Sequence, residues 1–444
     1  MNAKRLALSF TVCSLAVIGV AELAQSTPSA GTKAHPAVAQ PAVAADERTP
    51  YDPKLTQTTA VFWEKRVQNE PKGGIALREL AGAYLSLARE TGAISYAVRA
   101  EQAARKSLKF LPAEGNSVGL IRLARALLTQ HRFPEALKIA DQAAKQNPEA
   151  HRLRADIAIE LGNRVLAEKA MAKIPEVPGD PKRENDLNYQ ALRAHLLESK
   201  GQWQEALKLR MEAAARSDEF ADMPAETAAW YHTMAGHSLI DRGRLKEGEQ
   251  NCRRALEIFP LDYRAMTGLA EAAAWREDWK NAIAWGEKAI RIAPENPGVL
   301  VLLGDAFEKS GNKKEAARHY QLFEKLAASF PRIYDRDWIH FSADRKQNLN
   351  KALGWARRDL KLRQDAGAYD ALAWTCYKAG LLAEAKTMIQ KALDKGGSDA
   401  STLYHAGMIA YAAGERKRAQ KYFARAKAFN SYFLKTVSIP TKRA

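Results

Sequence analysis

An all-α solenoid of about ten antiparallel helix pairs is the fold class that this 444-residue sequence predicts. Three observations lead to it. Small residues recur in pairs twelve positions apart, these pairs follow one another at steps of about 34 residues, and a glycine stands seven positions after most of the first members. The helical runs between them show none of the polar and apolar alternation that strands require. A repeat array also accommodates the length, which exceeds the usual size of one compact domain.

The beginning of the sequence is typical of a signal peptide, over residues 1–21. Lys4 and Arg5 precede an apolar run, Leu6–Val20, that is short for a membrane span. We therefore expect an exported protein, periplasmic or secreted, with an uncleaved signal anchor as the alternative. Residues 22–59 consist mostly of Ala, Pro, Ser, Thr and Val, and we expect them to form an extended tether.

The helical repeats are expected over residues 60–430. Nine pairs of positions define their register, and seventeen of these eighteen residues are alanine or glycine. Two antiparallel helices approach closely only where neither carries a bulky side chain, so each pair marks the crossing point of one repeat. Residues 331–363 are irregular, because His340 stands in the first small position and no glycine follows. The pairs are Ala124 and Ala136, Ala155 and Ala167, Ala194 and Ala206, Gly236 and Gly248, Ala270 and Ala282, Gly304 and Ala316, His340 and Ala352, Ala373 and Ala385, and Gly407 and Ala419.

Signals at the helix ends agree with this register. A glycine seven residues after the first small position can adopt the left-handed conformation that ends a helix. Prolines at Pro148, Pro260 and Pro294 stand where the second helix should end. The segment Leu77–Pro112 fits one further repeat at the N-terminal side. The glycines are Gly162, Gly201, Gly243, Gly311, Gly380 and Gly414.

Together these residues make the chain similar to the tetratricopeptide repeat superfamily over roughly residues 60–430, with Met266–Pro294 and Leu300–Phe323 close to the family pattern. The resemblance implies a right-handed superhelix whose first helices line a concave inner surface. It also implies a scaffold that binds protein or peptide partners on that surface and is not an enzyme. The fold alone does not name the partner, since these repeats serve many assemblies. A remote alternative is an enzyme with an unrecognised site near Trp338–Trp355.

The concave face supplies the candidate partner-binding residues, which combine aromatic, arginine and acidic side chains typical of binding hot spots. The alternative is that the aromatic residues pack between neighbouring repeats. The candidates are Arg122, Arg125, His195, Trp230, His237, Arg264, Glu271, Trp275, Asp305, Glu308, Trp374, Tyr377, Tyr404 and Tyr411.

The C-terminal region is strongly basic within a chain whose formal charge is +17. After residue 414 the sequence contains nine Lys and Arg residues and one acidic residue, Glu415. We expect residues 431–444 to form a basic tail. This region could dock on anionic lipid or cell-wall polymer, or form a capping helix with a solvated basic face. Nucleic acid suits the charge but not an exported protein. The candidate surface residues are Arg416, Lys417, Arg418, Lys421, Arg425 and Lys427.

No catalytic, metal or cofactor signature stands out in the sequence. It contains no HExxH helix, GxxxxGK loop, GxGxxG turn or GxSxG elbow, and its nine histidines lack metal spacing. We therefore expect no catalytic residue, metal or cofactor. Cys252 and Cys376 fall more than three repeats apart, too far for a disulfide, and are expected as small core residues.

Overall fold

The structure is a computed structural model and describes residues 52, 54–176, 185–437 and 439. The expected signal peptide, residues 1–21, and most of the expected tether lie outside the described residues. The first helix, α1 (Leu55–Asn69), begins inside the segment 22–59 that the sequence assigns to the tether. Within the described ranges, no helix is both long and apolar enough to cross a membrane.

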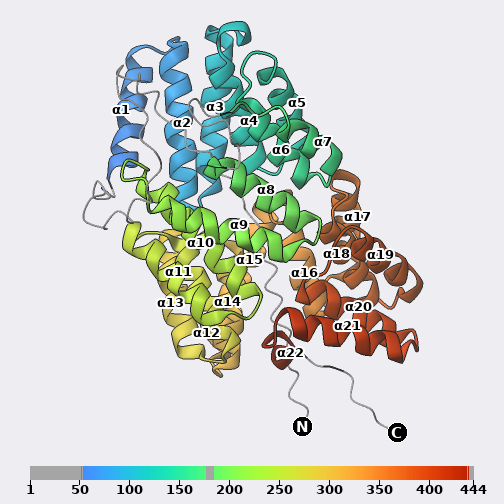
Figure 1. Cartoon of the computed structure of the whole chain (residues 1–444). Coiled ribbons are helices and arrows are strands. Elements are labelled where there is room, and N and C mark those ends of the chain that lie inside the picture. The colour runs from blue at the N-terminus through green and yellow to red at the C-terminus, as the bar shows by residue number, and fades with distance from the viewer. Residues whose placement is uncertain (1–51, 53, 177–184, 438, 440–444) are drawn as a thin grey trace, which may run out of the picture.

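Ten packed helix pairs follow α1, and the described part of the chain contains no strand (Figure 1). The predicted all-α solenoid of about ten pairs is therefore confirmed. The first five pairs are α2 (Gly74–Thr91) with α3 (Ile94–Phe110), α4 (Ser117–Thr129) with α5 (Phe133–Ala143), α6 (Ala150–Glu160) with α7 (Arg164–Met171), α8 (Leu187–Ser199) with α9 (Trp203–Ser217), and α10 (Ala225–Asp241) with α11 (Leu245–Ile258).

The second five pairs complete the array, and a 3-10 helix, η2 (Ala113–Gly115), connects α3 to α4. A single short helix, α22 (Phe433–Thr436), follows the last pair. These pairs are α12 (Tyr263–Trp275) with α13 (Trp279–Ile292), α14 (Pro297–Lys309) with α15 (Lys313–Ser329), α16 (Asp335–Arg345) with α17 (Leu349–Leu362), α18 (Ala366–Lys378) with α19 (Leu382–Asp394), and α20 (Ala400–Ala412) with α21 (Arg416–Phe429).

The small-residue pairs occupy the crossing points that the sequence predicts. All eighteen positions are buried, and each pair has its first member on the first helix and its second on the second helix. The fit is close at Gly248, where a Cβ atom would come within 2.9 Å of the Gly236 carbonyl oxygen. A side chain at either glycine would therefore push α10 and α11 apart.

The turns between paired helices follow one backbone rule, with or without glycine. All six predicted glycines have positive φ, as expected for a left-handed helix end. Where a pair lacks the glycine, His131, Glu277 and Lys346 adopt positive φ instead. The irregular segment 331–363 forms the pair α16 and α17, whose connection also holds Asn348 at positive φ.

The solenoid turns tightly enough that its first five pairs pack against its last five (Figure 1). Contacts between the two halves follow a constant register. The turn between the two helices of an early pair contacts the connection that follows the pair five places further along the chain. Thus the Gln364 backbone N–H donates to the Leu161 carbonyl at 3.2 Å. A Cβ on Gly201 would lie 2.5 Å from the Gly396 carbonyl oxygen. Further along, Asn430 Nδ2 donates to the Asp241 carbonyl at 3.0 Å.

Apolar contacts between the halves strengthen this closure. Ala88, Ile94 and Ala97 of the first pair share a buried cluster with Phe323 and Tyr334 of the second half. Burial of apolar surface is the main driving force for such contacts. The superhelix is therefore a closed body rather than an open spiral.

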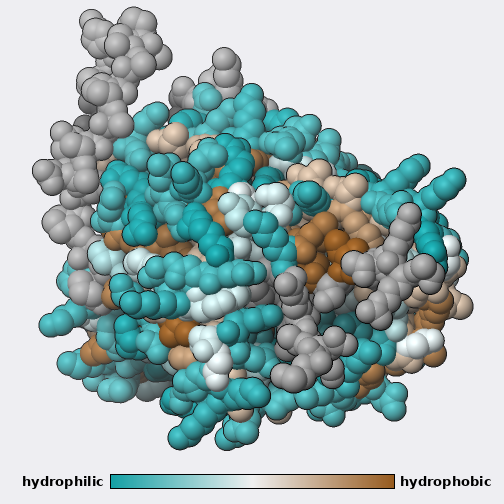
Figure 2. Space-filling model, turned by 90° about the horizontal axis from the view of Figure 1, so that it is seen from below, coloured by the Kyte–Doolittle hydropathy of each residue, from teal (hydrophilic) through white to brown (hydrophobic). Residues whose placement is uncertain are grey.

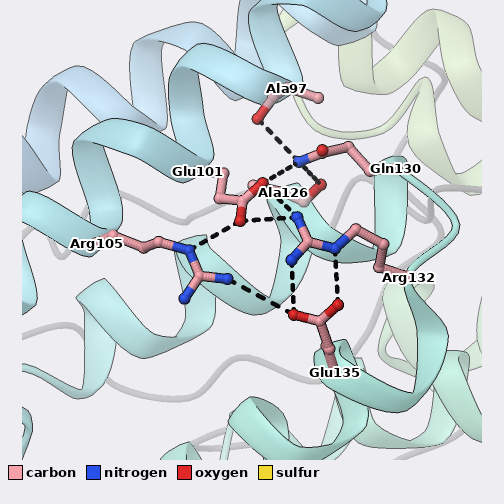
Figure 3. A network of polar contacts seen from close by, with 7 residues as sticks. All are labelled: Ala97, Glu101, Arg105, Ala126, Gln130, Arg132 and Glu135. Atoms are coloured by element: carbon pink, nitrogen blue, oxygen red, sulfur yellow. Dashed lines mark hydrogen bonds and ion pairs between the residues drawn. The ribbon is translucent and has the colours of Figure 1, made fainter. Parts of the chain in front are cut away.

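A network of charged and polar side chains joins the first pair to the second, as Figure 3 shows. Glu101 on α3 accepts hydrogen bonds from Arg105 and Gln130, each at 2.8 Å, and from Arg132 at 2.7 Å. Burial alone would raise the pKa of Glu101, but these donors outweigh it and lower the pKa. Arg132 also pairs with Glu135 at 2.6 Å. The network ties α3 to the turn between α4 and α5.

The two cysteines of the helical region are core residues, as predicted. Cys252 and Cys376 are both free and fully buried.

Polar side chains cover most of the face that Figure 2 shows, with hydrophobic areas between them.

Candidate functional site

A cavity of about 320 Å³, the central cavity, lies where the two halves of the superhelix meet, and charged, polar and aromatic side chains line it. On one side it is lined by the C-terminal ends of α6, α8 and α10, each of which is the first helix of its pair. The starts of α18 and α20 and the segment after α21 line the other side. Asp365 and Asp399 begin α18 and α20, since they accept hydrogen bonds from the backbone N–H groups of Ala368 and Thr402.

Arginine–carboxylate pairs support the cavity wall from both halves. Arg210 of α9 binds Glu198 through two hydrogen bonds of 2.6 and 2.8 Å. Burial would raise the pKa of Glu198, but the charge of Arg210 outweighs it and lowers that pKa. In the second half, Arg336 binds Asp359 at 3.2 Å and Asp365 at 3.0 Å. The Arg210–Glu198 pair is bidentate, and Arg336 joins two carboxylates, so both sets of contacts hold the cavity walls in place.

His195 lies between two carboxylates at the end of α6. Its Nδ1 is 3.4 Å from Asp156 Oδ1, and its Nε2 is 3.6 Å from Glu160 Oε1. Burial would lower the pKa of His195, but the nearby carboxylates of Asp156 and Glu160 raise it. Glu160 itself has a pKa raised to about 6 by burial. The imidazole of His195 thus lies within reach of both carboxylates at this end of the cavity.

His237 forms a second such contact one repeat further. Its Nδ1 lies 3.2 Å from Glu271 Oε2, and its Nε2 lies 2.9 Å from the Arg264 carbonyl. Burial would lower the pKa of His237, but the Glu271 carboxylate raises it to about 9. Next to it, burial and the negative charge of Glu271 raise the pKa of Asp241 to about 7.

Replacing Asp241 with asparagine is expected to stabilise the protein at pH 8 by about 1–2 kcal/mol. The folded-state pKa of about 7 lies above the ordinary value of 3.8. The favourable contribution of the neutral carboxyl is therefore complete below pH 3.8 and is lost as pH rises through 7. Thermal unfolding measured from pH 4 to pH 8 should show a melting temperature that falls less steeply in Asp241→Asn than in wild type.

The matched control for this variant is Asp222→Asn, at an exposed position. Because the side chain is exposed there, that change should alter stability at pH 8 by no more than about 0.5 kcal/mol. An Asp241→Asn protein that is less stable than wild type at pH 8 would contradict the unfavourable burial of this carboxylate.

The structure brings together only part of the predicted concave-face set. His195, His237 and Trp275 line the central cavity, and Arg125 and Arg264 line a second cavity of about 60 Å³ between the halves. All fourteen candidates are buried or half-buried. Their role in partner binding stays a prediction. The nine that line neither cavity are Arg122, Trp230, Glu271, Asp305, Glu308, Trp374, Tyr377, Tyr404 and Tyr411.

Several of these nine residues make contacts within the fold. Trp374 Nε1 donates to Asp344 Oδ1 at 2.7 Å, and its ring stacks on His405 with centroids 3.9 Å apart. Asp305 accepts a hydrogen bond from the Tyr320 hydroxyl at 2.6 Å. Trp374 thus joins its own pair to the pairs on either side, whereas Asp305 joins the two helices of one pair.

Apart from Trp275 on α12, the sequence did not indicate the cavity residues that come from the second half. Arg336 and Asp365 lie in or next to the irregular segment 331–363, and Asn430 and Phe433 follow the last repeat. An acidic residue just before a first helix, as at Asp365, was the available signal for a helix start. Nothing in the repeat pattern indicated that the starts of α18 and α20 would lie opposite the C-terminal ends of helices in the first half.

The predicted basic surface residues share one exposed helix. Arg416, Lys417, Arg418, Lys421, Arg425 and Lys427 all lie on α21 and are exposed. Arg418 forms an ion pair with Glu415 at 3.2 Å. Contact with an anionic surface stays a prediction. Across the residues that the structure describes, no group of three His, Cys, Asp or Glu side chains is placed to hold a metal ion.

Comparison with known proteins agrees with the repeat assignment. The family model for the tetratricopeptide repeat matches residues 121–181 and 233–297. Tetratricopeptide repeat protein 21A of Mus musculus is 26% identical over 176 residues, which are 40% of this chain and 13% of that protein. The chain thus spans a small part of the length of that relative. A solved structure, the human IFIT1 dimer with PPP-AAAA, aligns with a TM-score of 0.43 and 16% identity, covering 86% of this chain and 95% of that one.

The helix pairs and the repeats at residues 121–181 and 233–297 point to the same superfamily. The predicted resemblance to the tetratricopeptide repeat superfamily is confirmed by the family model and the helix pairs. Repeats of this kind indicate a protein-binding scaffold.

Proposed function

We propose that this chain is an exported scaffold that binds a segment of a partner protein inside its superhelix, at the central cavity. The observation that carries the proposal is the cavity itself, which combines charged side chains with the aromatic rings of Trp203 and Trp275. Such mixtures supply both contact area and directional polar contacts. Export is supported by the basic and apolar pattern of residues 1–21, and a role in assembling an envelope complex is a further part of the proposal.

A second candidate function is docking on an anionic surface, either lipid or cell-wall polymer. It is favoured by the six exposed cations of α21, because the sequence after residue 414 contains a single acidic residue, Glu415. Each such cation near an anionic membrane contributes about 1 kcal/mol of attraction.

Site-specific photocrosslinking in the producing cells is the test of both functions. A photoreactive residue at Ser401, which lines the cavity, should capture one or a few envelope proteins. The same residue at Ala284, exposed on α13, is the control and should capture none of them. Capture at Lys417 of lipid or polymer, with no protein captured at Ser401, would replace the scaffold proposal with surface docking.

A further inference from the structure

The segment after α21 folds back onto the first half of the superhelix. Asn430 is 1% exposed, and its Nδ2 donates to the Asp241 carbonyl at 3.0 Å. Its Oδ1 accepts the Tyr432 backbone N–H at 2.9 Å. Just before it, the Phe429 ring packs edge-on against Trp203, with centroids 5.6 Å apart. The segment therefore lies against the start of α9 and the end of α10.

The next anchor of this segment is Phe433. Its side chain is 5% exposed, and its ring centroid lies 5.9 Å from that of Trp275 and 5.8 Å from that of Tyr404. Val437 is 2% exposed and belongs to the same apolar cluster. Trp275 and Tyr404 are two of the residues that the sequence assigns to partner binding. A short segment of the chain itself thus occupies that part of the predicted surface.

The same segment also forms part of the wall of the central cavity, since Phe429, Asn430 and Phe433 line it. Only one turn of helix, α22, lies between Phe433 and Val437. A single helical turn has little stability of its own and depends on its side-chain anchors. Residues 431–437 can therefore separate without unfolding the helix pairs, since local openings cost less than global unfolding.

We propose that residues 430–437 act as a built-in ligand, and that the partner is a protein whose peptide segment replaces them. This inference rests on the proposed function and specifies its partner. The matching segment carries an aromatic residue at the position of Phe433 and an aliphatic residue four positions later. It also carries an amide side chain three positions before the aromatic residue, to replace the bond of Asn430 to Asp241.

The test uses the full chain and a labelled peptide with the sequence of residues 429–439. Fluorescence anisotropy should show that the Phe433→Ala chain binds this peptide at least about tenfold more tightly than wild type, because its own segment no longer competes. A peptide carrying the same Phe433→Ala change should bind neither chain. Tyr422→Ala, a half-buried aromatic residue on α21, is the matched control and should bind no more tightly than wild type.

Hydrogen exchange on the wild-type chain keeps the test valid if Phe433→Ala does not fold. Amides of residues 433–437 should exchange at least about a hundredfold faster than those of α20, and added peptide should not slow α20. Exchange of both regions at one common rate would mean that the segment is a fixed cap, and would overturn the proposal. Equal peptide binding by the two chains, or none, would also overturn it, whereas captured partners at Ser401 would still support the scaffold.

Discussion

Replacing Ala282 with glutamate is expected to lower the free energy of unfolding by about 3–5 kcal/mol. Ala282 on α13 is fully buried among Ala273, Ala274 and Ala306, so a longer side chain has no room. The substitution would also place an unpaired charge in an apolar contact between helices. Urea unfolding followed by far-UV circular dichroism should show a lower midpoint than wild type.

The control for this change lies two residues further on the same helix. Ala284→Glu introduces the same side chain at an exposed position and should alter stability by no more than about 0.5 kcal/mol. Because α13 contains both positions, helix propensity contributes equally to the two variants. Equal midpoints for the two proteins would mean that the small-residue register does not mark the helix crossings.

Local packing within a repeat could be predicted because it recurs at a fixed spacing. Close approach of two helices demands small side chains, and the requirement returns in every pair. The one exception is instructive. His340 occupies a small position on α16 and is buried, with its ring centroid 6.1 Å from that of His405 on α20. The larger side chain reaches across neighbouring pairs, which no rule for a single pair anticipates.

The turns between paired helices also could not be predicted in full from the positions of glycine. Glycine predicts a positive φ because it has no Cβ, but His131, Glu277 and Lys346 adopt it as well. In these pairs the packing of the two helices determines the turn and the residue accepts the strain. The spacing of the small residues was therefore a better guide to the turns than glycine was.

The closure of the superhelix, and with it the cavity, could not be predicted from the repeats. Its contacts join connections about 200 positions apart, such as Leu161 with Gln364, and they carry no periodic signal. Two of the candidate partner-binding residues, His195 and His237, line the cavity because they lie near the C-terminal ends of α8 and α10. Their neighbours Arg336 and Asp365 come from the other half, and only the closed structure brings them close.

Replacing Gly201 with alanine is expected to cost about 2–3 kcal/mol and to loosen the contact between the two halves. Gly201 has a φ of +76°, so any side chain there is strained. Its Cβ would also lie 2.5 Å from the Gly396 carbonyl oxygen and 2.9 Å from Ser398 Oγ. The backbone of the facing connection would have to move, and the hydrogen bond from Trp203 Nε1 to Ser398 Oγ, 2.7 Å long, would be disturbed. Thermal unfolding and small-angle X-ray scattering should show a lower melting temperature and a larger radius of gyration.

Gly380 provides the matched control, because it has the same backbone conformation without a facing half. Its φ is +81°, and a Cβ there would meet no atom within 4 Å. Gly380→Ala should therefore cost only the backbone strain, about 1–2 kcal/mol, and leave the radius of gyration unchanged. The difference between the two variants isolates the contribution of closure, since the strain at the turn is common to both. If both variants lose the same stability and keep the same radius of gyration, the two halves do not pack against each other at this turn in solution.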